Sequence, residues 1–332
     1  MTAVTGARPP ATPDDDKPRL VVANVSAGDR IFRGILRGAG ILVLVITASI
    51  LIFLAVRSVP AFKVAGFGFF TTSAFNGTQF GIAAILPLGV LIAIIALIIA
   101  VPVGIATALF ISEYAPAVLR RPLIAVIDLM AAIPSIVVAL FGLYFLTPRI
   151  LGFDSWLGRH LGFLPFFHVT GLNYPGTYVG ATFIAGVTVA LLVIPVIAAL
   201  SRQVFSQAPQ GEREAAYALG ATRWGMIRTV VLPYGRAGMI GASMLGLGRA
   251  LGETIAVSFI LTPILSFTPH VLQDGGNSVT YMIATYLLDV GANERSALLA
   301  AAMVLFVLTL GINVIAALVI SRSRSGASSD AD

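Results

Sequence analysis

Residues 211–233 read Gly-Glu-Arg-Glu-Ala-Ala-Tyr-Ala-Leu-Gly-Ala-Thr-Arg-Trp-Gly-Met-Ile-Arg-Thr-Val-Val-Leu-Pro and lie in a polar connection, residues 201–236, between two long apolar segments. Pro209 can open a helix here, because proline is tolerated in the first helical turn. Glu212 and Glu214 then fall in that turn, where the helix dipole favours negative charge. The connection is therefore predicted to contain a short polar helix.

A second short helix is predicted to follow within the same connection. Gly220 suits a helix C-terminus, because glycine adopts the left-handed conformation at little steric cost. The next helical stretch is expected over about 222–231 and is expected to stop at Pro233. Two short helices joined by a glycine-containing turn cannot bury themselves in lipid. This module is therefore predicted to be solvated or docked on another protein.

The composition of the whole chain favours a membrane protein. Hydrophobic residues make up 58% of the 332 residues and charged residues 11%, against roughly 25% charged in average soluble domains. These values exclude a disordered chain or a fibrous repeat, and they leave too few polar groups to cover a soluble globule. Cysteine is absent, so neither a disulfide framework nor a thiolate metal site is expected. The net charge of +6 comes from basic residues at the ends of apolar segments, which indicates membrane orientation and no nucleic-acid partner.

The apolar segments predict an all-α membrane protein with six transmembrane helices. Residues 38–56 carry no charge, and at 1.5 Å per residue they extend about 28 Å, close to the hydrocarbon thickness of a bilayer. The three histidines all fall in connections on the outer side and lack helical metal-ligand spacing, so no metal site is predicted. The six spans are expected at about 35–56, 82–111, 123–147, 178–200, 237–262 and 296–320.

Lysine and arginine set the expected orientation. With six spans, both termini lie on one side together with the 112–122 and 201–236 connections. That side holds 15 of these residues and the opposite loops hold 5, so the positive-inside rule places both termini in the cytoplasm. Residues 1–30, with an acidic run and several prolines, are predicted to be a disordered tail. The transmembrane domain is expected over 31–322, and 323–332 is expected to form a second cytoplasmic tail.

Two charged residues inside the fifth span are candidates for function. Arg249 and Glu253 are four residues apart, so on one continuous helix they share a face. Arg249 follows Arg236 by roughly 20 Å along the axis, near the bilayer centre, where an ionised group is costly unless it is paired or hydrated. One interpretation is an ion pair that only fixes helix packing. The other is a substrate pathway, in which Arg249 donates to an oxyanion and Glu253 accepts from a protonated oxygen of the same anion.

Enzyme chemistry is not indicated. The chain has no P-loop motif and no Ser/His/Asp or paired-carboxylate constellation, so it is predicted to be non-catalytic and not to bind ATP through a P-loop. Asp128 lies near the cytoplasmic end of the third span. Two interpretations of Asp128 are open: a structural partner for another helix, or a residue of the transport pathway.

The connection resembles a known signature. Glu214-Ala215-Ala216, three residues, Gly220, nine residues and Val230-x-Leu-Pro233 resemble the EAA signature of ABC importer permeases. The resemblance implies a type I ABC importer permease fold with a coupling helix that fits a groove on a cytoplasmic ATPase. It assigns this contact to Glu214, Ala215, Ala216 and Gly220.

A second resemblance narrows the family. Gly246-Leu-Gly-Arg-Ala-Leu-Gly-Glu-Thr-Ile-Ala-Val257 resembles a segment of the permeases of phosphate-specific (Pst) ABC importers, and Ile133–Leu143 is similar to the PstC type. Arg249, Glu253 and Thr254 then become candidates for the substrate pathway.

The Pst resemblance also implies a set of partners in the bacterial inner membrane. They are a second, PstA-like permease, two copies of a PstB-like ATPase and an extracytoplasmic PstS-like phosphate-binding protein. This chain would then hold no cofactor, and the ATPase subunits would bind ATP and Mg.

Two alternatives remain for the function. An ABC permease for another oxyanion, such as sulfate or molybdate, would share the EAA-like connection, although the Arg249–Val257 segment argues against it. An ion-gradient-driven secondary transporter often has two similar halves and broken helices. No half-to-half repeat is visible here, and such a transporter would leave the EAA-like connection unexplained.

Overall fold

The computed structural model describes residues 27–324, apart from 77–78 and 171–174. Most of the predicted N-terminal tail and the last residues of the predicted C-terminal tail lie outside these described residues. The chain divides into two units, Met1–Ile50 and Leu51–Asp332. The elements follow one another as α1 (Ala27–Ala65), α2 (Gly68–Thr71), β1 (Phe75–Asn76), β2 (Gln79–Phe80), α3 (Ile85–Leu109), α4 (Ala117–Ala132), α5 (Ser135–Phe141), α6 (Thr147–Leu161), α7 (Thr182–Phe205), α8 (Gln210–Ala218), α9 (Arg223–Met226), α10 (Leu232–Gly252), α11 (Ile255–Ile260), α12 (Val279–Tyr286) and α13 (Ala292–Arg324).

The described part of the first unit is the N-terminal portion of α1. Its apolar side chains are largely exposed within the unit; Leu44, for example, is 70% exposed. Two hydroxyl side chains in this stretch bond to their own helix: the Thr47 hydroxyl donates to the Val43 carbonyl and the Ser49 hydroxyl to the Val45 carbonyl. A helix with satisfied polar groups and an apolar surface is suited to lipid contact.

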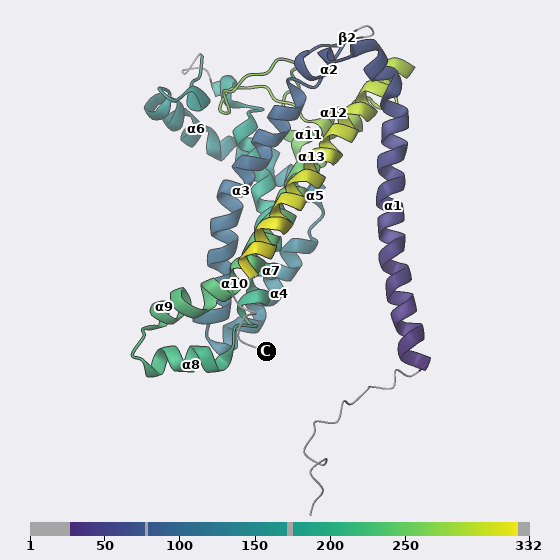
Figure 1. Ribbon diagram of the computed structural model, residues 1–332. Coiled ribbons are helices and arrows are strands. Elements are labelled where there is room, and N and C mark those ends of the chain that lie inside the picture. The colour runs from purple at the N-terminus through teal and green to yellow at the C-terminus, as the bar shows by residue number, and fades with distance from the viewer. Residues whose placement is uncertain (1–26, 77–78, 171–174, 325–332) are drawn as a thin grey trace, which may run out of the picture. The chain divides into compact units, whose positions relative to one another are not determined.

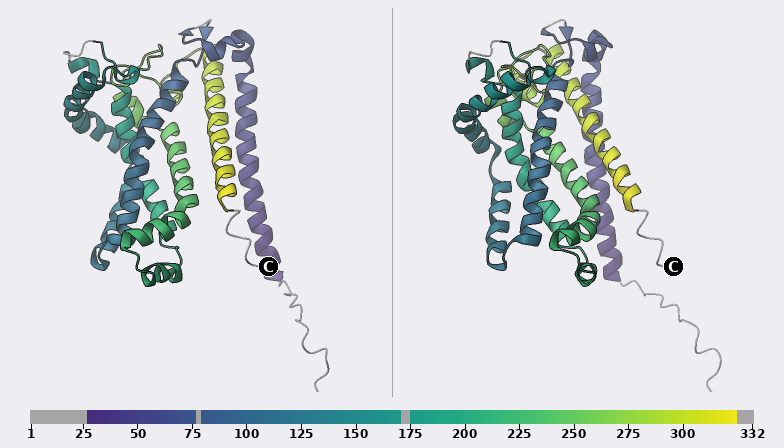
Figure 2. Two further views of the ribbon diagram at one scale, coloured as in Figure 1. Left: turned by 60° about the vertical axis from the view of Figure 1, so that its left-hand side comes forward. Right: turned by 90° about the vertical axis from the view of Figure 1, so that its left-hand side faces the viewer.

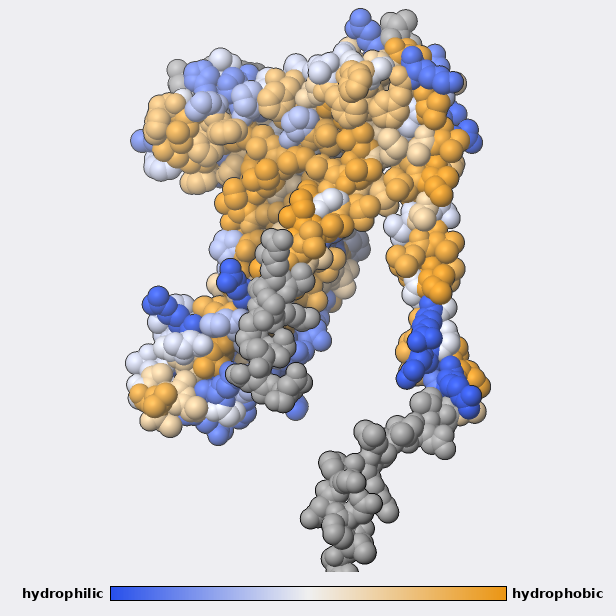
Figure 3. Space-filling view, in the orientation of Figure 1, coloured by the Kyte–Doolittle hydropathy of each residue, from blue (hydrophilic) through white to orange (hydrophobic). Residues whose placement is uncertain are grey.

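Six helical stretches among the described residues are long and apolar enough to span a membrane, as predicted. Five of them lie wholly in the second unit. Figure 3 shows apolar side chains along its helices and hydrophilic ones gathered over α8 and α9. An apolar surface of this extent is stable in hydrocarbon and not in water.

Small residues hold the centre of the second unit together. Helices α3, α7 and α10 run side by side (Figures 1 and 2). On α3, Ala93, Ala96 and Ala100 are fully buried, and a Cβ on Gly104 would meet Ile197 of α7 at 2.9 Å. Small residues at three- and four-residue spacing let two backbones approach closely, which is how helices associate in lipid.

Two predicted spans are interrupted rather than continuous. The third, expected over 123–147, is divided between α4 and α5–α6, because Ile133 is extended and Pro134 follows it. Helix α5 continues through a π-helical turn at Gly142–Leu146 into α6. The fifth, expected over 237–262, ends as α10 at Gly252 and resumes as α11.

The predicted stop of the second short helix at Pro233 is wrong. Helix α9 continues through a π-helical turn, Ile227–Val231, and α10 begins at Leu232 with Pro233 in its first turn. Proline is tolerated in a first helical turn, and π-helical turns re-route the neighbouring backbone hydrogen bonds. The connection therefore passes directly into the fifth span.

Candidate functional site

The first predicted helix of the 201–236 connection is α8. Pro209 precedes it and Glu212 lies in its first turn, as expected, whereas Glu214 lies beyond that turn, contrary to the prediction. At its other end Gly220 has a φ of +82°. The Gly220 N–H donates to the Tyr217 carbonyl at 2.9 Å and the Ala221 N–H to the Ala216 carbonyl at 3.0 Å. These two bonds form a Schellman motif, which requires the left-handed conformation that glycine provides.

The second part of the connection starts at a side-chain cap. The Thr222 hydroxyl accepts a hydrogen bond from the Gly225 N–H at 3.1 Å and so satisfies a donor at the start of α9. Around this turn three large apolar or aromatic side chains are exposed, and Leu219 is 89% exposed. The other two are Tyr217 and Trp224. Apolar side chains exposed at a polar end of the molecule are typical of a protein-binding surface.

The coupling residues predicted from the sequence lie on different faces of α8. Glu214 and Ala215 are exposed, and Glu214 accepts a hydrogen bond from the Gln210 amide at 3.0 Å. Ala216 is half-buried and packs against a cluster that includes Phe205 and Ile227. One face of α8 is thus anchored to the rest of the unit, and the other is open to a partner.

An ion pair holds α8 against the end of α3. Nη1 of Arg213 lies 2.9 Å from both carboxylate oxygens of Glu113, which sits in the π-helical turn Phe110–Tyr114. Arg213 also donates to the Phe205 carbonyl at 2.6 Å and the Ala208 carbonyl at 3.2 Å. The two side chains are 15% and 4% exposed. A charge-assisted pair this well buried is costly to break, because one charge is then left without a partner.

The sequence analysis did not identify Glu113 or Arg213 as functional. The two residues are 100 positions apart, and no local pattern joins them. One feature of the sequence could have drawn attention to Arg213: it lies between Glu212 and Glu214 in the predicted first helix.

Arg249 lies in the last turn of α10 and is half-buried. Its Nε atom is shielded from solvent and has no hydrogen-bond partner. Among the described residues, no carboxylate is within ion-pair distance of its guanidinium. Gly248 and Gly252, which flank Arg249, have nothing within 4 Å of an added Cβ, whereas a Cβ on Gly246 would meet Val193 at 2.8 Å.

The prediction that Arg249 and Glu253 share one helix face is wrong, because Glu253 is in extended conformation after α10 ends. Its carboxylate accepts a hydrogen bond from the Ala256 N–H at 3.2 Å and so caps α11. Its carbonyl accepts from the Thr280 hydroxyl at 2.9 Å. The neighbouring Thr254 hydroxyl donates to the Gly252 carbonyl at 3.3 Å. The interruption between α10 and α11 therefore contains the polar side chains of Glu253 and Thr254.

The charged residue of the third predicted span, Asp128, is exposed on α4.

Comparisons with known proteins identify the family of the chain. Residues 100–325 match the family described as "Binding-protein-dependent transport system inner membrane component". The chain is 38% identical over 309 residues to "Phosphate transport system permease protein PstC 2" of Mycobacterium tuberculosis (strain ATCC 25618 / H37Rv), covering 90% of this chain and 95% of that protein. It is 39% identical over 271 residues to "Phosphate transport system permease protein PstC" of Mycobacterium leprae (strain TN), covering 80% and 84%.

A solved structure shares the fold. The chain superposes with a TM-score of 0.55 and 20% identity on a chain of a bacterial ABC transporter involved in the import of the acidic polysaccharide alginate, covering 88% of this chain and 99% of that one. This likeness confirms the predicted ABC importer permease fold. The match over residues 100–325 shows that the chain belongs to the family of binding-protein-dependent transport system inner membrane components.

Proposed function

We propose that this chain is a permease subunit of an ATP-driven importer of inorganic phosphate in the bacterial inner membrane. The observation that carries the proposal is the 38% identity to a phosphate transport system permease over 90% of this chain and 95% of that protein. Similarity over nearly the full length of both chains covers the spans, the interrupted helices and the α8–α9 module together. The alginate-transporter likeness supports only the fold.

The α8–α9 module supports a role in coupling. Helix α8 is anchored by Arg213 and exposes Glu214 and Ala215, and the exposed Leu219 lies beside it. This surface fits a groove on a cytoplasmic ATPase, and the turn at Gly220 presents it. ATP and Mg then bind to two PstB-like ATPase subunits, and this chain moves in response to their closure.

The break between α10 and α11 supports a role in the substrate pathway. Arg249 has an unsatisfied donor, and Gly248 and Gly252 leave space beside it. Glu253 and Thr254 stand at the break itself. Discontinuous spans at substrate sites are common in transporters, because freed backbone and side-chain groups can bind a polar solute. A second, PstA-like permease completes the pathway, and a PstS-like protein delivers phosphate from outside.

Uptake by reconstituted vesicles tests this function. The chain is reconstituted with its second permease, ATPase and binding protein, and uptake of radiolabelled phosphate and of radiolabelled sulfate is measured with ATP on the ATPase side. We expect phosphate uptake that vanadate abolishes and that a hydrolysis-deficient ATPase does not support. Uptake of sulfate in place of phosphate would assign a different oxyanion. Uptake driven by an ion gradient without ATP would contradict an ABC importer.

A further inference from the structure

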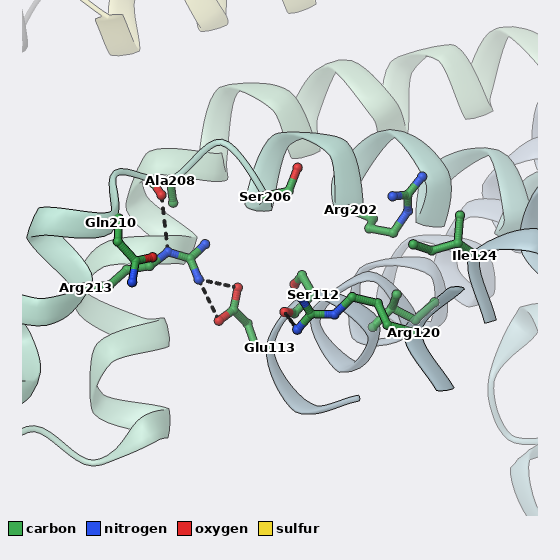
Figure 4. Close-up of a pocket in the computed structure, with 10 residues that line it drawn as sticks. Ser112, Glu113, Arg120, Ile124, Arg202, Ser206, Ala208, Gln210 and Arg213 are labelled. Carbon is green, nitrogen blue, oxygen red and sulfur yellow. Dashed lines mark hydrogen bonds and ion pairs between the residues drawn. The ribbon is translucent and has the colours of Figure 1, made fainter. Parts of the chain in front are cut away.

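A pocket of about 230 Å³ lies beside the first turn of α8, and Gln210 and Arg213 of this helix line it (Figure 4). It is bounded by the π-helical turn after α3, by α4, by the end of α7 and by α8. Figure 4 shows the ion pair of Arg213 and Glu113 on one side and Arg120 and Arg202 on the other. The polar and charged side chains that line it include Ser112, Glu113, Arg120, Arg202, Ser206 and Arg213.

The lining carries more positive than negative charge. It includes three guanidinium groups and one carboxylate, and that carboxylate is already bound by Arg213 through both oxygens. Arg120 donates to the Ser112 carbonyl at 2.9 Å, a neutral acceptor. Within the described ranges, neither Arg120 nor Arg202 has a carboxylate at ion-pair distance. Two cationic side chains therefore face one pocket without a counter-charge.

One of these cations also has an unsatisfied donor. The Nε atom of Arg202 is shielded from solvent and has no hydrogen-bond partner. A buried donor without an acceptor costs roughly 1–3 kcal/mol, so such groups normally bind a protein atom, a water or a ligand. A neutral water would satisfy the donor but would leave the surplus charge. An anion with several acceptor oxygens satisfies both.

We propose that this pocket binds a phosphate group, supplied either by free inorganic phosphate or by the headgroup of an anionic lipid. The arginine forks match the geometry of phosphate oxygens. The pocket is distinct from the proposed pathway at Arg249. Because Arg213 of α8 lines it, a bound phosphate group lies next to the coupling helix.

Binding to the full-length chain tests the site without transport. The chain is placed in nanodiscs of neutral phosphatidylcholine, and bound radiolabelled orthophosphate is measured at equilibrium. In a second arm the nanodiscs contain phosphatidylglycerol, and native mass spectrometry counts the lipids that the protein retains. The double variant Arg120→Gln/Arg202→Gln removes both cations. Arg228→Gln, at an exposed position outside the pocket lining, is the matched control.

We expect the double variant to bind one of the two probes at least roughly tenfold more weakly than the wild type, and the control to match the wild type. Loss of orthophosphate identifies a free anion, and loss of phosphatidylglycerol identifies a lipid. Unchanged binding of both probes would overturn the proposal. Because neither arm uses ATP or partner subunits, the result is independent of the substrate that the assembled importer carries.

A labelling experiment on the wild-type chain avoids any effect of the substitutions on folding. Phenylglyoxal modifies accessible arginines, and mass spectrometry gives the modification rate at each position. Orthophosphate or phosphatidylglycerol should slow modification of Arg120 and Arg202 but not of Arg228. If neither orthophosphate nor phosphatidylglycerol changes the modification rates of Arg120 and Arg202, the site is contradicted.

Discussion

At the scale of single residues, Arg213 joins three parts of the chain. Its guanidinium binds Glu113 in the π-helical turn after α3, the carbonyl of Phe205 at the end of α7 and the carbonyl of Ala208 between α7 and α8. Lysine cannot make these contacts together, because its ammonium lacks the planar fork. If a partner moves α8, we expect this side chain to transmit the movement to α3 and α7.

Breaking the pair should loosen α8. We expect Glu113→Gln and Arg213→Lys each to cost about 3 kcal/mol of local stability and to raise amide hydrogen exchange in α8 by roughly 100-fold. ATP-driven uptake should fall in parallel. Glu212→Gln, on the exposed face of the same helix, is the control and should leave the exchange of α8 unchanged.

A double-mutant cycle tests whether the two side chains act as one unit. Glu113→Gln combined with Arg213→Lys should cost little more than Arg213→Lys alone, because both single changes weaken the same ion pair. Additive effects, or single variants that exchange like the wild type, would show that the ion pair does not hold α8.

The unsatisfied Arg249 allows a sharper test of the pathway. Arg249→Lys keeps the charge but removes the fork, so we expect phosphate uptake to fall by roughly tenfold or more while the complex still assembles. Arg236→Lys, an exposed position on the same helix, is the matched control.

Glu253→Gln keeps an oxygen that can accept from the Ala256 N–H, so the cap on α11 survives and only the negative charge is lost. We expect Glu253→Gln to reduce discrimination of phosphate from sulfate, because glutamine can also donate to a fully deprotonated oxyanion. Competition between the two labelled anions in the uptake assay measures this. If Arg249→Met combined with Glu253→Gln transports phosphate at nearly the wild-type rate and selectivity, neither residue belongs to the pathway.

At the scale of elements, Gly220 determines how the α8–α9 module turns. Its φ of +82° is disfavoured for residues with a Cβ by roughly 1–2 kcal/mol, and a branched side chain is affected most. Nothing lies within 4 Å of an added Cβ at Gly220, so conformation and not space limits the substitution.

Gly220→Val should therefore displace the exposed coupling surface and reduce the amount of ATPase that co-purifies, while membrane insertion is unchanged. Gly220→Asn should retain most of the binding, because asparagine tolerates the left-handed region. Gly211→Val is the control: Gly211 also has open space, but its φ is not positive. Normal ATPase binding and uptake by Gly220→Val would contradict the role of this turn.

At the scale of the whole molecule, the distribution of basic residues predicts the orientation in the membrane. Because the chain has no cysteine, a single introduced thiol reports its own location. Ser206, at the end of α7, and Ser266, between α11 and α12, are both exposed. In intact cells we expect an impermeant thiol reagent to label Ser266→Cys and to leave Ser206→Cys unlabelled until the cells are opened. The reverse pattern would invert the topology.

Much of the architecture was predictable because it depends on short stretches of sequence. The length and polarity of each apolar segment decide whether it can span a bilayer, so six spans were expected and are confirmed. The family was expected from the resemblance of the EAA-like connection and is also confirmed. The α8 helix and the turn at Gly220 are likewise local, since Pro209 and the Schellman hydrogen bonds all lie within a dozen or so residues. The continuous fifth span was a wrong prediction, because an apolar pattern continues through Glu253 and gives no sign that this carboxylate caps a new helix.

Only the tertiary structure decided which distant groups meet. Glu113 and Arg213 are 100 positions apart, and their pairing depends on how α3 and α7 pack through small residues. The same packing leaves Arg202 and Arg249 each with a buried donor that has no acceptor in the described part of the chain. Whether a charged side chain has a partner depends on the positions of all its neighbours. Sequence periodicity describes only one helix at a time, so the number of spans was predictable and the partners of their charges were not.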